Sequence, residues 1–425
     1  MKIGIIGGTD GLGKTLIYFL KDEFEVAISG RDHIKGNKVA DEFEVKYYES
    51  NTDLASESDI LIISVPINYT NTVIRETADY MKDGSVMIDV TSVKEEPSKT
   101  MAEVLPDTVE YVPTHPIFGP RTTELDNQVI VLTPIEKGQW YERIFNYLNN
   151  KNMRVIETTS QNHDYMMSIV QVLTHFSFIS TASAMEKLKI NITETEDYES
   201  PIYNLMIDMI ARIVSQNPYL TYYIQTMNNN GTKIRNAFAD AVIELKDAIN
   251  NGDELTFVEI ADKATKNMGD IKAALGRSDK AISSLSHEHS HLIQLKGHEV
   301  GLKDIYTSKV YVGILENIKK DTAILKNKNG IEIIKISNIE ILNPEELYQW
   351  KIDNYKHVLK EINCEFDRKI NSEVIEKTIA NLDNIINVII IDNENNLTIK
   401  IESLYEDSID EVKRLLTGFG GIIHE

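Results

Sequence analysis

The alternation of apolar and polar positions divides the chain into stretches of different character. Up to about residue 158, short apolar runs alternate with amphipathic segments, which is typical of a mostly parallel sheet covered by helices on both faces. The pattern predicts strands at 2–7, 25–29, 59–66, 85–90, 110–112, 128–133 and 154–158, and helices at 69–82 and 139–149. Because such sheets bind ligands at the carboxyl ends of their strands, we expect Val65 and Pro66 to lie at a binding edge.

From residue 160 to about 275 the strand signal gives way to helical spacing. Helices are expected at 163–188, 202–216, 218–228 and 233–249. In the first of them the apolar residues cover more than one face of the helix: Met166, Met167, Ile169, Val170, Leu173, Phe176 and Ile179. A helical domain that buries this excess against a second copy of itself predicts a homodimer.

The last third of the chain changes pattern again after a hinge-like stretch at 276–290. Short strands are expected at 311–317, 322–326 and 331–336, with a hairpin turn at Asn329-Gly330, which indicates a small β-barrel. The remainder reads strand, helix, strand, strand, helix, strand, as in a ferredoxin-like fold, at 364–370, 372–382, 388–391, 397–402, 408–416 and 421–424.

The predicted organisation therefore has four parts. A Rossmann-like α/β domain for dinucleotide binding spans 1–158, and an all-helical substrate and dimerisation domain spans 159–285. A small β-barrel-like module follows at 286–345, and a ferredoxin-like (ACT-like) module with an expected regulatory role closes the chain at 346–425.

Composition narrows the range of functions. A chain of 425 residues with a formal net charge of −22 is expected to hold several domains and to be a poor partner for nucleic acid. No apolar run approaches the roughly 20 residues that span a bilayer, and a strand is expected directly after Met1, so we expect a cytoplasmic protein. Cys364 is the only cysteine, which excludes an internal disulfide and a cysteine-rich metal site.

A glycine-rich segment follows the first expected strand and opens a helix, which is the setting of a dinucleotide-binding turn. Its residues are Gly7, Gly8, Thr9, Asp10, Gly11, Leu12 and Gly13. Asp10 replaces the middle glycine of the usual pattern, where a carboxylate is unfavourable beside a pyrophosphate unless it caps the helix and points away. A purely structural glycine turn is the alternative.

The end of the second expected strand favours NADP over NAD. Ser29 and Arg31 suit a 2′-phosphate, whereas an acidic residue there would hold a ribose hydroxyl. Asp32 argues for NAD, because a small shift of the strand end would bring it to that place.

His115 is the leading candidate for acid–base chemistry. It lies between stiffening residues, because Pro116 restricts the backbone of His115 and Pro120 fixes a second φ angle. An imidazole held in one orientation suits a proton acceptor near neutral pH. The alternative is a turn histidine that caps local carbonyl groups.

Several separated motifs together resemble the prephenate dehydrogenase family, in particular its archaeal branch with a C-terminal extension, over about residues 1 to 280. The matching segments are Gly7–Gly13, Asp89–Lys94 (D-x-x-S-x-K), Thr114–Pro120 (H-P-M-F-G-P in the family), Gln171–Phe176 (Q-x-L-x-H-F), and Ser200–Tyr203 followed by Ala211-Arg212. The resemblance implies the NAD(P)-dependent oxidative decarboxylation of prephenate to 4-hydroxyphenylpyruvate, in tyrosine biosynthesis. Arogenate, the amino analogue, fits the same motifs.

The resemblance also assigns roles to residues. His115 would accept the proton of the ring hydroxyl and Ser92 would position that hydroxyl or the imidazole, while Arg212 would bind the side-chain carboxylate. His175 and Lys94 would complete the anion pocket, and Arg121 would join that pocket or bind the cofactor phosphates. Structural alternatives are a strand-end cap for Ser92, a packed core histidine for His175 and a surface ion pair for Arg212.

Three other functions are less well supported. His287-Glu288-His289-Ser290-His291 has the H-E-x-x-H spacing of zinc peptidases, but no third ligand is evident and no metal is expected. A dehydrogenase of 3-hydroxy acids would need a catalytic lysine where His175 stands, and a non-catalytic dinucleotide sensor would make His115 dispensable.

For residues 286–425 we expect feedback control by tyrosine, with oligomerisation or partner docking as the alternative.

Overall fold

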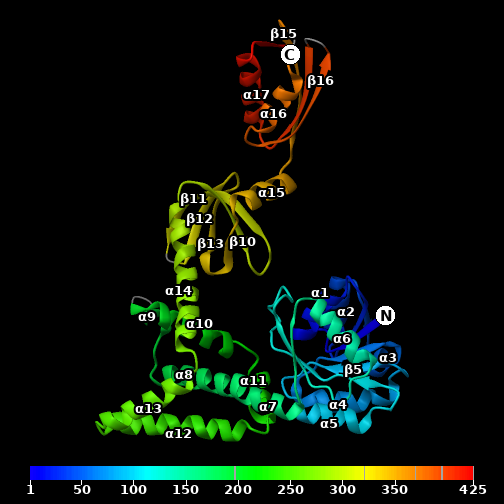
Figure 1. The fold of residues 1–425 in the computed structure, drawn as a ribbon, viewed down its shortest axis with the longest axis vertical. Coiled ribbons are helices and arrows are strands. Elements are labelled where there is room, and N and C mark those ends of the chain that lie inside the picture. Colours follow the sequence, from blue (N-terminus) through cyan, green and yellow to red (C-terminus); the bar gives the residue numbers. More distant parts are fainter. Residues whose placement is uncertain (196–197, 320, 369, 394–395, 425) are drawn as a thin grey trace. The chain divides into compact units, whose positions relative to one another are not determined.

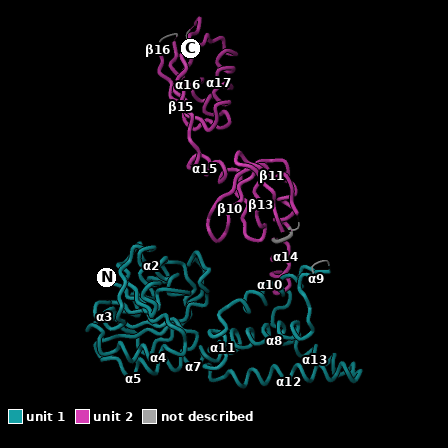
Figure 2. Tube along the Cα trace, turned by 180° about the vertical axis from the view of Figure 1, so that it is seen from behind, with its two compact units in different colours: residues 1–272 teal, residues 273–425 magenta. Residues whose placement is uncertain are grey.

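The structure is a computed structural model that describes residues 1–195, 198–319, 321–368, 370–393 and 396–424. The chain divides into two compact units, residues 1–272 and 273–425 (Figure 2). Each unit contains its own clusters of buried apolar residues. No helix of the described ranges is both long enough and apolar enough to cross a membrane.

The first unit begins with a six-stranded parallel sheet. In spatial order its strands are β3 (Lys46–Tyr48), β2 (Glu25–Ser29), β1 (Lys2–Ile6), β4 (Ile60–Ile63), β5 (Val86–Asp89) and β6 (Glu110–Tyr111). The strand order reverses between β1 and β4, and ligands bind at this point in open α/β sheets. The predicted Rossmann-like class is confirmed.

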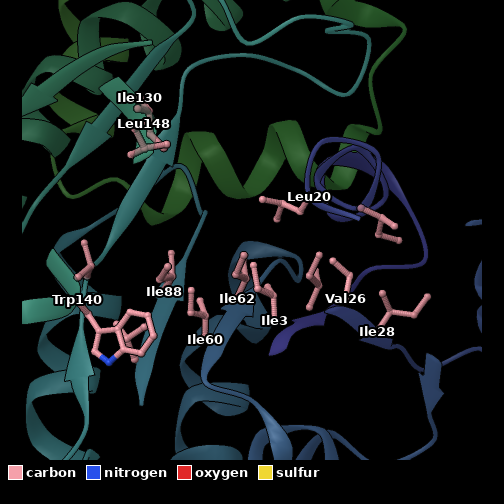
Figure 3. Close-up of a cluster of buried hydrophobic side chains, with 14 of the residues drawn as sticks. Ile3, Leu20, Val26, Ile28, Ile60, Ile62, Ile88, Ile130, Trp140 and Leu148 are labelled. Atoms are coloured by element: carbon pink, nitrogen blue, oxygen red, sulfur yellow. The ribbon is translucent and has the colours of Figure 1, made fainter. Parts of the chain in front are cut away.

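Helices cover both faces of this sheet (Figure 1). One face packs against α1 (Gly11–Leu20), α2 (His33–Phe43) and α6 (Gln139–Asn150). The other packs against α3 (Asn51–Glu57), α4 (Ile67–Thr77) and α5 (Glu95–Val104), and a short turn, η1 (Ala78–Tyr80), follows α4. Figure 3 shows the first cluster, in which Ile3 and Ile62 of the sheet lie between Leu20 of α1 and Trp140 of α6.

A separate three-stranded sheet carries the histidine loop. It comprises β7 (Thr114–Pro116), β8 (Val129–Leu132) and β9 (Arg154–Glu157), with β7 antiparallel to β8 and β8 parallel to β9. The sequence pattern predicted β8 and β9 but missed β7 and β3. Both missed strands have only three residues, and β7 contains a proline, which cannot donate to a strand partner.

The helical part of the first unit begins with α7 (Ser160–Met167), a π-helical turn, η2 (Ser168–Leu173), and α8 (Thr174–Lys187). The remaining helices are α9 (Ile192–Thr195), α10 (Pro201–Val214), α11 (Pro218–Met227), α12 (Gly231–Asn250) and α13 (Glu254–Asn267). Val172 and Ile224 of this part pack against Ile67 and Val93 of the nucleotide-binding part. That contact brings η2 and α11 to the strand ends of the parallel sheet.

The predicted hinge at 276–290 is wrong. Those residues lie within a single helix, α14 (Ile271–Gln294). An isolated glycine in a helix costs only about 1 kcal/mol relative to alanine, and the alanines and leucine before Gly276 are good helix formers. The glycine was therefore too weak a signal to predict a break.

The second unit contains two antiparallel sheet modules. The first has the spatial order β13-β12-β11-β10-β14, so β13 and β14 are its edge strands, and the turn at Lys328-Asn329 joins β12 to β13. Its elements are β10 (Glu299–Asp304), β11 (Val310–Lys319), β12 (Thr322–Asn327), β13 (Gly330–Lys335), η4 (Ile336–Asn338), β14 (Ile339–Ile341) and α15 (Pro344–Asn354).

The last module has the predicted ferredoxin-like order, and its sheet runs β16-β17-β15-β18. Its elements are β15 (Val358–Phe366), α16 (Ser372–Ala380), β16 (Ile385–Asn393), β17 (Asn396–Ser403), α17 (Glu406–Gly418) and β18 (Gly421–His424). The first strand lies earlier than the predicted 364–370, and residue 369 is outside the described residues. Cys364 is buried in this module.

Candidate active site

The loop between β1 and α1 has the geometry of a dinucleotide-binding turn. Gly7 has a φ of +85°, and a Cβ on Gly13 would lie 2.3 Å from the carbonyl oxygen of Gly7, so α1 approaches the strand end too closely for a side chain. Gly11, the first residue of α1, has no atom within 4 Å of the place a Cβ would take. The open helix start fits a pyrophosphate, which backbone N–H groups would bind.

Asp10 caps α1, as its position in the glycine loop required. Its Oδ1 accepts a hydrogen bond from the amide of Gly11 at 2.8 Å, and the ammonium group of Lys35 binds Oδ2. The hydrogen bond from Lys35 is the main cause that lowers the pKa of Asp10. The negative charge of Asp10 is thus balanced by Lys35 at the edge of the loop. Thr9 packs over Gly30 at the end of β2, and Leu12 is half-buried in α1.

Of the two residues predicted to select the cofactor, only Arg31 is accessible. Ser29 is fully buried and its hydroxyl donates to Oδ1 of Asn51 at 2.8 Å, so it is not available to a phosphate. Arg31 is exposed, and its guanidinium lies 4.8 Å from the ring centre of Tyr69. Asp32 caps α2 by accepting from the amide of Lys35 at 3.0 Å. Val65 and Pro66 lie between β4 and α4, as predicted.

The structure brings the histidine loop to the glycine loop. His115 is the middle residue of β7, and the chain after it reaches the first turn of α1, where the hydroxyl of Thr15 donates to the carbonyl oxygen of Pro120 at 3.2 Å. Arg121 follows directly and is exposed. This contact holds the backbone just before Arg121 against α1, the helix that begins at the glycine loop.

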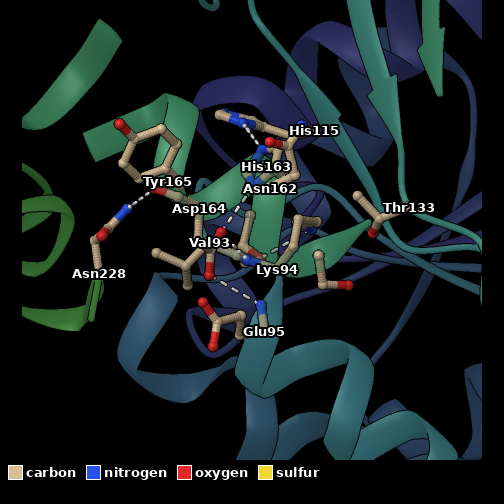
Figure 4. Close-up of polar contacts among 12 residues, drawn as sticks. Val93, Lys94, Glu95, His115, Thr133, Asn162, His163, Asp164, Tyr165 and Asn228 are labelled. Carbon is tan, nitrogen blue, oxygen red and sulfur yellow. Dashed lines mark hydrogen bonds and ion pairs between the residues drawn. The ribbon is translucent and has the colours of Figure 1, made fainter. Parts of the chain in front are cut away.

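His115 belongs to a hydrogen-bonded relay that the sequence did not reveal (Figure 4). Its Nδ1 lies 2.9 Å from Nε2 of His163, and Nδ1 of His163 lies 2.7 Å from Oδ1 of Asp164. The carboxylate of Asp164 also accepts from the backbone amides of Lys94 at 2.8 Å and Glu95 at 3.0 Å. His163 and Asp164 are adjacent in sequence, but nothing in their spacing points to His115, which lies 48 residues before His163.

The relay fixes which nitrogen of His115 is free to accept a proton. A carboxylate only accepts hydrogen bonds, so Nδ1 of His163 donates to Asp164, and in the neutral ring of His163 the remaining nitrogen, Nε2, accepts from Nδ1 of His115. Nε2 of His115 is then left with its lone pair. Burial is the largest cause that lowers the pKa of His115 well below 6.5, and the nearby ammonium group of Lys94 acts in the same direction, which keeps the ring neutral at neutral pH.

Gln171 of the helical part contacts His115, and His175 follows it in α8. Gln171, in the π-helical turn η2, has its Nε2 3.4 Å from Nε2 of His115. His175 lies one turn further, in α8, and is only 8% exposed. Burial lowers the pKa of His175, and its Nδ1 has no hydrogen-bond partner among the described residues.

Lys94 does not lie in an anion pocket. Its side chain is fully buried, and its ammonium group binds the carboxylate of Asp89, the carbonyl oxygen of Thr114 at 2.6 Å and the hydroxyl of Thr91 at 3.3 Å. These acceptors use its three N–H groups. Burial lowers the pKa of Lys94, against the opposing influence of Asp89. The ion pair instead holds the end of β5 to the strand that carries His115.

The other predicted site residues are placed as follows. Ser92 is half-buried in the loop between β5 and α5, two residues before Lys94. Arg212 is exposed in the last turn of α10, and the described contacts do not join it to the relay. His287 and His291 stack on one face of α14 with ring centres 6.4 Å apart. In the described ranges, no group of three or more metal-ligating side chains is present.

Known families and proteins match both parts of the first unit. The nucleotide-binding domain of prephenate dehydrogenase matches residues 18–157, and the prephenate dehydrogenase dimerization domain matches residues 159–263. A probable arogenate/prephenate dehydrogenase of Methanocaldococcus jannaschii is 39% identical over 381 residues, which cover 88% of this chain and 85% of the relative. The chain belongs to the prephenate dehydrogenase family.

More distant relatives agree with this family. The T-protein of Haemophilus influenzae is 26% identical over 270 residues, which cover 63% of this chain and 67% of that protein. The crystal structure of prephenate dehydrogenase from Aquifex aeolicus has the same fold, with a TM-score of 0.52 at 16% identity over 62% of this chain and 98% of that chain. The chain is an NAD(P)-dependent dehydrogenase of the prephenate/arogenate class, in tyrosine biosynthesis.

Replacement of Lys94 by methionine tests its structural role. Lys94→Met leaves the buried carboxylate of Asp89 without its partner, and we expect the free energy of unfolding of the first unit to fall by about 3–5 kcal/mol. Lys82→Met is the matched control, because Lys82 pairs with Asp59 in a half-exposed bridge worth at most about 1 kcal/mol. Urea titration followed by Trp140 fluorescence in a Trp350→Phe background measures both; equal losses would contradict the assigned role.

Proposed function

We propose that this dehydrogenase uses Nε2 of His115 as the acceptor of the proton from the ring hydroxyl of its substrate. The proposal depends on the relay, because the relay directs the lone pair on Nε2 of His115 away from His163 and toward the side chain of Gln171. Burial keeps the base unprotonated at neutral pH. The hydrogen bond from Thr15 to the loop after His115 supports a position of the base beside the cofactor loop.

His115 and Asp164 would have separate roles in the oxidative decarboxylation. Bound NAD(P) supplies the acceptor for the hydride that leaves the hydroxyl-bearing carbon. His115 takes the hydroxyl proton as the ring carboxylate departs as carbon dioxide, and formation of the aromatic ring drives the reaction. Asp164 holds the relay in one tautomer throughout, because its carboxylate is fixed by two backbone amides.

We propose that the substrate contacts Ser92, Arg212 and His175 and that it does not contact Lys94, whose ammonium group is buried and already paired. Ser92 lies in the loop that leads into α5 and would position the hydroxyl, while His175 lies one turn beyond Gln171 and would face the substrate. Arg212 would bind the side-chain carboxylate in a bidentate pair. Prephenate and arogenate remain equal candidates, since they differ only in the side chain.

We further propose that NADP is preferred and that the active form is a homodimer. Arg31 is exposed at the end of β2, and its competitor Asp32 is already engaged in capping α2. The helical part exposes apolar side chains in keeping with a second copy, among them Met166 at 46% and Val170 at 52%. A match to the family's dimerization domain supports the same assembly.

The His115→Asn variant tests the base. We expect kcat with prephenate or arogenate to fall by about 10²- to 10⁴-fold, while the exposed control His424→Asn keeps wild-type activity. A His115 pKa well below 6.5 also predicts that kcat/KM of the wild type holds steady as the pH falls through 6.5, since the base is still neutral there. An acid limb at or above pH 6.5, or an active asparagine variant, would contradict the assignment.

Arg31→Ala tests the choice of cofactor. The loss of a charged hydrogen bond to the 2′-phosphate is expected to raise the KM for NADP by about 10- to 100-fold and to leave the KM for NAD nearly unchanged. Arg75→Ala is a suitable control, because Arg75 forms an exposed ion pair with Glu103. Equal effects on both cofactors would count against the proposal.

The effector site for tyrosine is proposed for the ferredoxin-like module at 358–424, and its support is the topology of that module. If tyrosine binds there, a chain that ends at residue 285 will lose its inhibition by tyrosine, while the full chain keeps it. Steady-state assays with prephenate or arogenate, with and without tyrosine, decide this for both chains. Inhibition that is unchanged in the shorter chain would contradict the proposal.

A further inference from the structure

The free nitrogen of His115 does not face open solvent. His115 is only 2% exposed, and the side-chain amide of Gln171 lies over its Nε2 at a distance of 3.4 Å. Since Nε2 of the neutral ring is an acceptor, the nitrogen end of the amide is the end that faces it. The contact is at the long limit of a hydrogen bond, so the hydroxyl of a substrate can displace it at small cost.

The other end of the same amide is unsatisfied. Oε1 of Gln171 is buried and has no hydrogen-bond partner among the described residues. A buried acceptor without a partner costs about 1–3 kcal/mol, so its persistence calls for an explanation. The backbone at this point is also unusual, because Gln171 lies in the π-helical turn η2, and such turns are frequent at functional sites.

We propose that Gln171 is a positioning residue whose amide turns over with the charge of His115, offering its N–H end to the neutral ring and its oxygen to the protonated ring. This proposal rests on the proposed role of His115 as the base. When His115 has taken the proton of the substrate hydroxyl, Nε2 becomes a donor and Oε1 becomes its acceptor. Gln171 gains and loses no proton itself.

Among the described residues that contact His115, Gln171 is the one that meets Nε2 and can accept a hydrogen bond from it. His163 from α7 faces the ring on the relay side, with Asp164 behind it, and Lys94 from the loop before α5 is paired with Asp89. None of these contacts meets Nε2. An acceptor on that side stabilises the protonated ring, which burial otherwise disfavours.

Gln225 provides a matched comparison. It is half-buried, and its Oε1 also lacks a partner, but its Nε2 donates to the carbonyl oxygen of Val172 at 2.8 Å. That bond is structural, and the described hydrogen bonds join no ionisable side chain to this side-chain amide, although the guanidinium of Arg235 binds the backbone carbonyl oxygen of Gln225. A carboxylate introduced at Gln225 should therefore not act on His115 as one introduced at Gln171 does.

The experiment compares Gln171→Glu with Gln225→Glu. A glutamate at 171 offers an acceptor permanently, so we expect the pKa of His115, and with it the acid limb of kcat/KM, to rise by about one unit or more. Gln225→Glu should leave both in place. The variant Gln171→Met has neither the N–H donor nor the oxygen acceptor of the amide. We expect it to lower kcat about tenfold, with the acid limb of its kcat/KM profile at a lower pH than that of Gln171→Glu.

Two readouts separate the possible failures. The pKa of His115 is followed without substrate by NMR of labelled histidine, with the signal assigned from His115→Asn, and circular dichroism confirms that each variant folds. If the wild type oxidises neither prephenate nor arogenate, the proposed function fails while the titration still tests Gln171. If His115 titrates alike in wild type, Gln171→Glu and Gln225→Glu, the amide switch is overturned.

Discussion

The carboxylate of Asp164 is the group on which the geometry of the site depends. It accepts two backbone amides at the start of α5 and one imidazole nitrogen, so a single side chain of the helical part is bound to the nucleotide-binding part. A negative charge at the start of a helix is also favoured by the helix dipole. The tautomer of His163, the orientation of His115 and the free lone pair all follow from this one attachment.

The buried ion pair between Lys94 and Asp89 also positions the residues of the site. The pair between Lys94 and Asp89 joins the end of β5 to β7, and the backbone of Lys94 is itself one of the donors to Asp164. The same residue thus serves the relay through its amide and the strand ends through its side chain. A buried ion pair is costly to form, but it specifies one arrangement of the groups around it. This arrangement fixes the position of His115, because Lys94 binds the backbone of the preceding residue, Thr114.

The sequence predicted the parts of the structure that depend on local pattern. The ends of β2 and the order of the last module agree with the periodicity of apolar residues, and His115, which was singled out because of Pro116 and Pro120, lies in the relay. The relay was not found, because contacts between residues 48 positions apart leave no trace in spacing. Lys94 was misplaced for a similar reason, since a motif identifies a residue but not the direction of its side chain. Gly276 shows that one weak helix residue does not decide a boundary.

The π-helical turn has a consequence for how the neighbouring sequence is read. A π turn contains one residue more than an α-helical turn, so it rotates everything after it by about 100° relative to a continuous helix. The segment from α7 through η2 to α8 thus carries two helical phases. Apolar residues from Met166 to Ile179 were found on more than one face, and part of that spread comes from the phase change. A one-residue deletion within η2 would restore a single phase and change the direction in which His175 points relative to Gln171.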